Sequence, residues 1–192
     1  MSITTTDTQV LSNEPITLAE AKIQLGVTHN LDDARITRHI LEAREEAEGI
    51  TNRTLRLSVT HARTYDGWPS EMRFDSPPLE SVVSVTYYDI DDVSQTLSSS
   101  NYVVRTPTDG RGDLTWSRAA GTTLPALTDR IDSVTVNYTT GYTSADAVPE
   151  RAKGSILMLV SALYDQSELK ESEAYRSTAR RRLADIDWGI YE

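Results

Sequence analysis

The sequence predicts an α+β protein in which a helical body, made of two N-terminal and two C-terminal helices, carries an inserted antiparallel β lobe. Apolar residues recur at helical spacing in segments near each end of the chain. Between these segments, short runs rich in β-branched and aromatic residues alternate with a period of two. The connections between the runs are too short for the crossover helices that parallel strands require, so we expect a largely antiparallel sheet.

A polar arm and a short helix are expected at the N-terminus. Residues 1–13 are polar and threonine-rich and show no periodicity, which is typical of a flexible arm. The first helix is predicted within residues 16–27. Thr17 can cap its N-terminus, Glu20 follows three residues later as a capping box requires, and Gly26 provides a stop signal.

A longer helix is predicted within residues 31–55. Asp32 or Asp33 supplies an N-cap and a charge that suits the positive end of the helix dipole. One narrow apolar face runs along the segment, and the opposite side is acidic. The apolar face comprises Ile36, Ile40, Ala43, Ala47 and Ile50, and the acidic side comprises Glu42, Glu45, Glu46 and Glu48.

The β lobe is predicted over residues 57–143, with about five to seven strands. Residues that favour turns separate the alternating runs and divide the lobe into short strands. These turn signals are Asp66-Gly67, Pro77-Pro78, Asp91-Asp92, Asp109-Gly110 and Gly121.

Two more helices are predicted after the lobe, within residues 149–167 and 173–186. Pro149 suits a helix start, because the N–H that proline lacks would have no partner there. Apolar residues cover most of the circumference of the first of these helices, not just one stripe. The helices at the two ends must pack together, because neither pair can bury its apolar stripe alone. The expected organisation is an arm (1–13), N-terminal helices (14–56), a β lobe (57–143), C-terminal helices (144–184) and a tail (185–192).

Composition limits the possible function. The 192 residues carry a formal net charge of −10, so we expect no nucleic-acid binding through general attraction. The absence of cysteine excludes disulfides, zinc–thiolate sites and cysteine nucleophiles. The longest apolar run, residues 156–160, is too short to span a membrane, and the first residues lack the pattern of a secretion signal. We therefore expect a soluble protein made in a cytoplasm.

Motifs that carry chemistry are not found. The three histidines are scattered, and neither a phosphate-binding glycine loop nor a GxSxG nucleophile motif is present. The acidic run at residues 89–92 lacks the glycine and the terminal glutamate of a calcium loop, which favours a hairpin turn. The tripeptide Arg111-Gly112-Asp113 follows a turn signal and is interpreted as part of a strand connection. We predict no catalytic residues, no cofactor and no metal.

Several segments together resemble one known family, the head–tail connector (adaptor) proteins of tailed phages. They are EPITLAEAKIQLGV, ILEAREEAEGITNRTL, FDSPPLESVVSVTYYD, NYVV, VTVNYTTGY and VPERAKGSILMLVSALYD, which occur in the order of the family. The resemblance covers residues 14–167 and extends to prophages and gene-transfer agents. It matches less clearly over the last twenty-five residues.

The resemblance implies a structural protein of the virion and not an enzyme. Copies of such proteins, about twelve of them, form a ring below the portal. The ring extends the DNA channel without sequence-specific DNA binding and offers a docking surface to the next neck or tail protein, a stopper or tail terminator. The implied location is the head–tail junction of a particle assembled in the host cytoplasm.

Three sets of residues are candidates for these contacts. The apolar helix 149–167 is either central in its own body or partly covered by a neighbouring copy in the ring. The acidic side of the second helix is either simply solvated or a channel wall that repels DNA phosphates. Arginines and apolar residues near the C-terminus either interact with other parts of the same chain or form a docking site for the portal. The expected intersubunit residues are Leu157, Met158 and Val160, the channel acids are Glu42, Glu45, Glu46 and Glu48, and the docking residues are Arg176, Arg180, Arg181, Arg182, Ile186, Trp188, Ile190 and Tyr191.

Two other function classes stay open. A β module that binds a small ligand or a carbohydrate would need a concave cluster drawn from Trp68, Tyr87, Tyr88, Tyr102 and Trp116. A hydrolytic enzyme with acid catalysis would need a buried pair of carboxylates.

Overall fold

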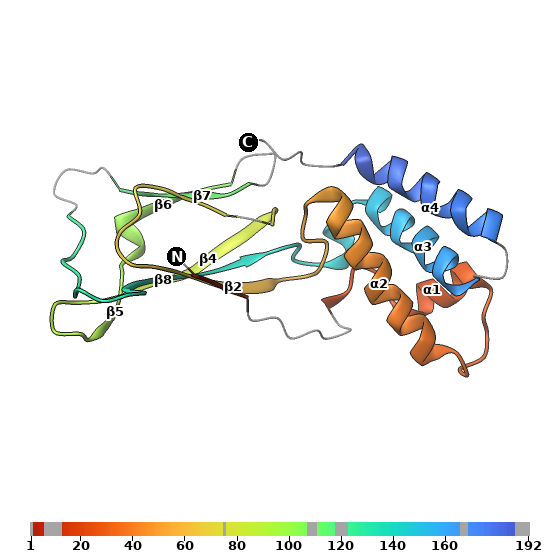
Figure 1. Ribbon diagram of the computed structural model, residues 1–192, viewed down its shortest axis with the longest axis horizontal. Coiled ribbons are helices and arrows are strands. Elements are labelled where there is room, and N and C mark those ends of the chain that lie inside the picture. The colour runs from red at the N-terminus through yellow and green to blue at the C-terminus, as the bar shows by residue number, and fades with distance from the viewer. Residues whose placement is uncertain are drawn as a thin grey trace. The chain divides into compact units, whose positions relative to one another are not determined.

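The computed structural model describes residues 2–5, 13–74, 76–106, 111–117, 123–165 and 169–186, with the backbone alone for 2–5 and 169–171. Within these ranges the chain is α+β, with two N-terminal and two C-terminal helices and antiparallel β-sheets, as the sequence predicts (Figure 1). The chain divides into two compact units. The β unit combines the N-terminal strand with residues 58–141, and the helical unit combines the flanking segments 9–57 and 142–192.

The helical unit is built around its third helix. Helix α3 packs against α1, α2 and α4, and the buried side chains of all four form one core. This arrangement explains why α3 is apolar around most of its circumference, since its own unit covers several of its sides. The helices are α1(Leu18–Leu25), α2(Asp33–Thr51), α3(Glu150–Tyr164) and α4(Leu169–Ala184).

Helix α1 has the predicted capping box and stop. The backbone N–H of Glu20 donates to Thr17 Oγ1 at 3.2 Å, and the backbone N–H of Thr17 donates to Glu20 Oε2 at 2.6 Å. These bonds lower the pKa of Glu20, with the backbone bond from Thr17 as the largest cause. Gly26 ends the helix in the left-handed conformation, at φ 68°.

The start of α2 differs from the expected cap. Asp32 occupies the N-cap position, but its side chain makes no capping bond to the helix backbone. Its carboxylate instead accepts a hydrogen bond of 2.7 Å from the hydroxyl of Tyr164, at the end of α3. Arg35 adds a second link between these helices, because its Nη2 donates to the Tyr164 carbonyl at 2.8 Å. Asp32 thus joins two helices that are far apart in sequence.

The β unit contains two antiparallel sheets in the part of the chain that the structure describes. The larger sheet has the strand order β1-β2-β8-β4-β5, so the last strand in sequence pairs between β2 and β4. The smaller sheet has the order β3-β7-β6. The strands are β1(Ser2–Thr5), β2(Val59–Tyr65), β3(Met72–Arg73), β4(Leu79–Tyr88), β5(Ser94–Thr96), β6(Tyr102–Arg105), β7(Asp113–Trp116) and β8(Val134–Thr140).

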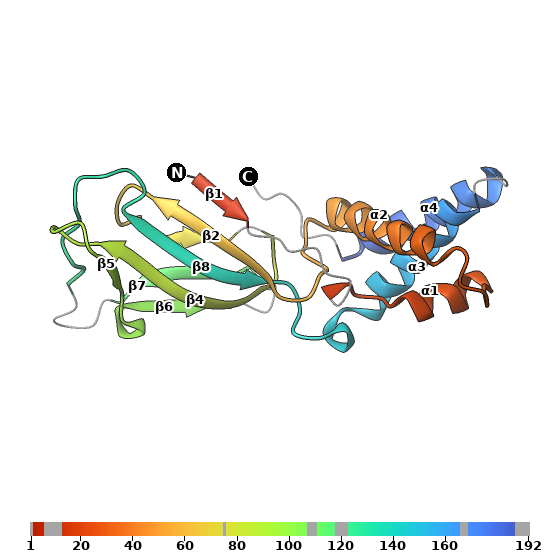
Figure 2. The same cartoon turned by 90° about the horizontal axis from the view of Figure 1, so that it is seen from below.

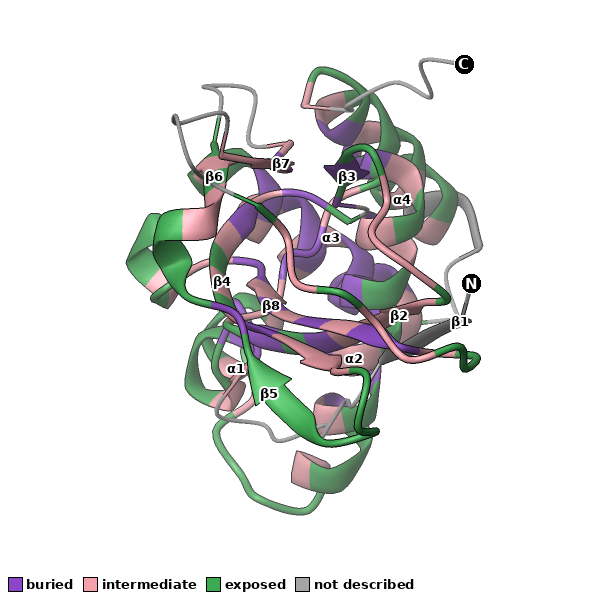
Figure 3. Cartoon of the chain, turned by 90° about the vertical axis from the view of Figure 1, so that its left-hand side faces the viewer, coloured by how far each residue is buried: buried purple, intermediate pink, exposed green. Residues whose placement is uncertain are grey.

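Side chains from both sheets fill one core inside the β unit. Strand β8 shows the strict alternation that such a core requires: Val134, Val136 and Tyr138 are buried, and the residues between them are only half-buried. The smaller sheet contributes residues such as Leu114, and the β3 region contributes Phe74. Figure 3 shows these buried stretches on the inside of the unit.

The N-terminal segment differs from the expected flexible arm. Ser2–Thr5 form β1, which pairs antiparallel with residues 61–64 of β2. Polar character alone suggested an arm, whereas the open edge of β2 offers backbone groups with which even a polar segment can pair. The rest of the segment up to residue 12 lies outside the described residues.

Two short motifs have structural roles. Asp89 closes the β4–β5 hairpin, because its Oδ1 accepts from the backbone N–H groups of Asp91 and Val93, and these bonds lower the pKa of the carboxylate. Gly112, at the centre of the Arg-Gly-Asp tripeptide, is buried against Leu79, and a Cβ there would clash with the Leu79 side chain. Both motifs therefore serve the strand connections.

Candidate functional site

The arginines of α4 do not form one uniform patch. Arg180 binds Glu46 of α2, with Nη2 2.9 Å and Nε 3.2 Å from Oε1. Arg182 turns towards α3, where its Nη1 lies 3.8 Å from the sulfur of Met158. Arg176 is half-buried, and its Nε has no hydrogen-bond partner among the described residues, whereas Arg181 is exposed. Arg180 and Arg182 thus hold α4 against the other helices of the helical unit, and Arg181 faces solvent.

The acids of α2 divide into two groups. Glu42 and Glu45 have side chains that are 47% and 58% exposed, respectively. Glu46 is bound to Arg180 of α4. Glu48 is largely covered, and its Oε1 accepts from the backbone N–H of Leu55 at 2.7 Å. Only Glu42 and Glu45 keep the exposure that a channel wall requires.

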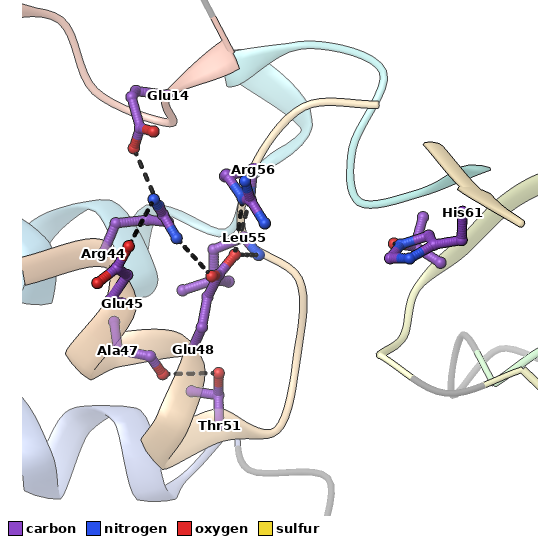
Figure 4. Close-up of polar contacts among 10 residues, drawn as sticks. Glu14, Arg44, Glu45, Ala47, Glu48, Thr51, Leu55, Arg56 and His61 are labelled. Atoms are coloured by element: carbon purple, nitrogen blue, oxygen red, sulfur yellow. Dashed lines mark hydrogen bonds and ion pairs between the residues drawn. The ribbon is translucent and has the colours of Figure 1, made fainter. Parts of the chain in front are cut away.

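A buried arginine lies at the centre of a polar network in the helical unit (Figure 4). Arg44 of α2 is 1% exposed, yet it lies among the apolar side chains of the core-facing side of the helix. Its Nε lies 3.2 Å from Glu14 Oε2, and its Nη1 lies 2.7 Å from Glu48 Oε2. Glu48 in turn accepts from the backbone of Leu55 and Arg56, just after α2. One arginine therefore fixes the segment before α1 and the segment after α2.

Burial and neighbouring charges shift the pKa values of Glu14 and Arg44 in this network. Loss of solvent raises the pKa of Glu14 above its ordinary 4.5, although Arg44 opposes the effect. Burial alone would lower the pKa of Arg44, but the charges of Glu48 and Glu14 outweigh it and raise that pKa. Arg44 thus keeps its charge, and Glu48 is its closer counter-ion.

Sequence reasoning missed Arg44, although one signal was present. Arg44 follows Ile40 by four residues and precedes Glu48 by four, so it lies on the apolar side of the helix beside a possible ion-pair partner. A charged residue at such a position needs a buried partner. Its second partner, Glu14, is thirty residues away in sequence, and periodicity gives no information about that contact.

The proposed intersubunit residues of α3 differ in exposure. Val160 is fully buried in the core of the helical unit, so its side chain offers no surface to another copy. Leu157 and Met158 are half-buried at the border of that core. Of the three, only Leu157 and Met158 stay candidates for such a contact.

The proposed docking tail is described only at its start. Ile186 is half-buried and packs against the core of the helical unit. Trp188, Ile190 and Tyr191 lie outside the described residues. Their role in docking stays a prediction.

The aromatic residues of the β unit pack inside it. The ring of Trp68 lies 5.0 Å from that of Trp116 and 5.4 Å from that of Tyr87. The indole N–H groups of Trp68 and Trp116 donate to the carbonyls of Pro125 and Pro69, at 2.9 and 2.5 Å. Tyr102 also packs against this core, and the guanidinium of Arg130 lies over the ring of Tyr88. Trp68, Tyr87, Tyr102 and Trp116 thus stabilise the β core, whereas Tyr88 pairs with Arg130. Among the described residues, the five rings therefore do not form the single cluster that the ligand-binding alternative expects.

The three histidines serve separate parts of the chain. His39 is buried on α2 between Arg35 and Glu42, at 3.3 and 3.2 Å. His61 stacks on Tyr138 in the β core, and His29 is exposed. Among the residues with described placement, no group of three His, Cys, Asp or Glu side chains is arranged to hold a metal. In the same ranges, none of the helices combines the length and apolarity that a membrane crossing needs.

Comparison with known proteins points to one family. Residues 15–104, from just before α1 into β6, match the family model described as "Phage gp6-like head-tail connector protein". The match spans just under half of the chain, and over these residues the chain resembles the head-tail connector family. That family is one of structural connectors and not of enzymes. No curated protein matches the sequence of this chain.

Solved structures share the fold of this chain. A chain described as "Neck of empty GTA particle computed with C6 symmetry" matches with a TM-score of 0.67 and 17% identity, over 92% of this chain and 95% of that chain. Another, "Neck of native GTA particle computed with C12 symmetry", matches with a TM-score of 0.66 and 18% identity over the same shares. A chain from the "Virion of native gene transfer agent (GTA) particle" gives similar values. The likeness covers both units of the chain and establishes its fold.

Proposed function

We propose that this chain is a head-tail connector, which lies at the head–tail junction of a phage-like particle and joins the DNA-filled head to the neck. The observation that carries the proposal is the agreement of the family with the fold. The family model covers the first half of the helical unit and much of the β unit. The fold likeness to a chain from a neck with C12 symmetry covers 92% of the connector. Copies of the connector then form a closed ring of about twelve subunits, between the portal and a stopper or tail terminator.

The proposed portal contact uses α4 and the residues after it. Arg181 is exposed, and the Arg180–Glu46 bond holds the helix that presents it. A guanidinium can bind a carboxylate through two parallel hydrogen bonds, so an acidic segment of the portal is a suitable partner. Residues 187–192 add apolar side chains that can enter a groove of that partner.

The proposed channel function depends on charge. Glu42 and Glu45 are exposed on α2, and the whole chain carries a net charge of −10. Acidic side chains on the wall of a channel repel phosphates, which lets DNA pass without binding. Glu48 has no part in this function, because its side chain is largely covered. Glu45 is also paired with Arg44, at 3.5 Å, but its side chain stays 58% exposed.

The test is to mix the connector with the portal ring of its own particle and to measure native mass. We expect a discrete complex with one connector per portal subunit. Arg181→Glu should weaken this complex, whereas Arg105→Glu, which changes an exposed arginine in the β unit, should leave it intact. Absence of a complex at every salt concentration would contradict the proposed function.

A further inference from the structure

One face of the larger sheet consists almost entirely of small uncharged side chains. The register of β2, β8 and β4 points every second residue away from the core, and within the described residues no other strand or helix of the β unit lies over them (Figure 2). We call this surface the hydroxyl face. It comprises Thr60, Ala62 and Thr64 of β2, Thr135, Asn137 and Thr139 of β8, and Ser81, Val83, Ser84 and Thr86 of β4.

Polar groups on the hydroxyl face bind one another across the strands. The hydroxyls of Ser81 and Thr139 are 2.8 Å apart, and Asn137 Nδ2 donates to Ser84 Oγ at 3.0 Å. Thr86 Oγ1 donates to the carbonyl of Thr135 at 3.4 Å. Removing water from a polar group costs less free energy when that group already has a hydrogen-bond partner in the protein. Another protein can therefore cover this face without leaving many polar groups unsatisfied.

The absence of charge on this face is unusual for the chain. Charged residues make up 25% of the sequence, but none of the residues of the hydroxyl face is charged. In β2, His61 and Arg63 pair with the inward residues Tyr138 and Val136 and so lie on the other side of the sheet. The charged residue of β4, Glu80, lies at a register shift beside Leu79, where the face ends.

The same face carries an exposed apolar side chain. Val83 lies at the second register shift of β4, beside Ser84, and is 61% exposed. A bulge of this kind places two residues opposite one, which turns an extra side chain towards solvent. Val83 thus provides an apolar contact point in the middle of a neutral surface.

We propose that the hydroxyl face is a contact surface for a second copy of the connector. The inference rests on the proposed ring, in which each copy must offer two different surfaces to its neighbours. Copies with a net charge of −10 repel one another, so a close contact is most favourable where the surface carries no charge. DNA does not fit this face, because binding to phosphates requires cationic side chains.

The test compares Val83→Glu with Val103→Glu, in the full chain with its portal ring. Val103 is 49% exposed on β6 of the smaller sheet, so it is a matched valine away from the hydroxyl face. We expect Val83→Glu to raise the connector concentration needed for ring assembly by about tenfold or more, because a buried unpaired charge opposes docking. Val103→Glu should assemble like the unmodified chain. Circular dichroism of each variant serves as the control that the variant is folded.

A second readout needs no disruptive charge. Because the chain has no cysteine, Val83→Cys and Val103→Cys each introduce a single thiol. On assembly, the thiol at position 83 should become protected from a maleimide reagent, and the thiol at position 103 should stay reactive. A ring that forms with position 83 fully reactive, or with equal effects of the two glutamates, would overturn the proposed surface but leave the ring intact. If the unmodified chain forms no ring on the portal, the proposed function itself fails.

Discussion

At the scale of single residues, Arg44 has the largest expected effect on stability. It is buried, it is charged, and it forms ion pairs with three carboxylates of the helical unit, those of Glu14, Glu45 and Glu48. Removal of one partner of a buried ion pair leaves the others unpaired and costs about 3–5 kcal/mol. We therefore expect Arg44→Ala to lower the free energy of unfolding by that amount in urea titrations. Arg38→Ala, on the exposed side of the same helix, should change it by less than about 0.5 kcal/mol.

Glu14 gives this network a defined pH dependence. Its pKa in the folded state is raised above the unfolded value of 4.5, so the folded state binds this proton at a higher pH. The contribution of Glu14 to stability is therefore complete below about pH 4.5 and is lost as the pH rises through the folded pKa. We expect the unmodified chain to gain stability relative to Glu14→Gln when the pH falls from 7 to 5. Parallel pH profiles of the two proteins in urea unfolding would contradict this.

At the scale of elements, α1 depends on its cap. The helix has eight residues, which is too short to be stable by propensity, and its first turn is closed by Thr17 and Glu20. We expect Thr17→Ala to destabilise the helical unit by about 1 kcal/mol and Thr17→Ser to have little effect, as measured by thermal unfolding. The pKa of Glu20 is lowered, so the stability from its ionised form is present above about pH 4.5 and is lost as the pH falls through the folded pKa.

The elements themselves were largely predictable, and their pairing was not. The capping box of α1 and the Asp89 turn depend on neighbours within a few residues, so the sequence shows them directly. The position of β8 between β2 and β4 joins residues that are 47 to 81 positions apart, and periodicity contains no information about it. The candidate site also depends on long-range contacts that periodicity does not show. The exposure of the α4 arginines depends on the Arg180–Glu46 pair, which is separated by 134 residues.

At the scale of the whole molecule, each unit has a core of its own. Trp68 and Trp116 both belong to the core of the β unit. With Trp188→Phe as background, tryptophan fluorescence should therefore follow the β unit, and helical circular dichroism should follow the helical unit. We expect Arg44→Ala to shift the dichroism transition and to leave the fluorescence transition almost unchanged. Equal shifts of both transitions would show that the units unfold as one.

The division of the helical unit into two sequence segments also affects how the protein is made. A ribosome releases β1, α1 and α2 first, then the β strands from β2 to β8, and only at the end α3 and α4. The core of the β unit can thus be completed on the nascent chain, whereas the core around α3 must wait for the last residues. Until then the apolar face of α2 lacks its partners α3 and α4, and premature termination of translation would leave much of it exposed to chaperones and proteases.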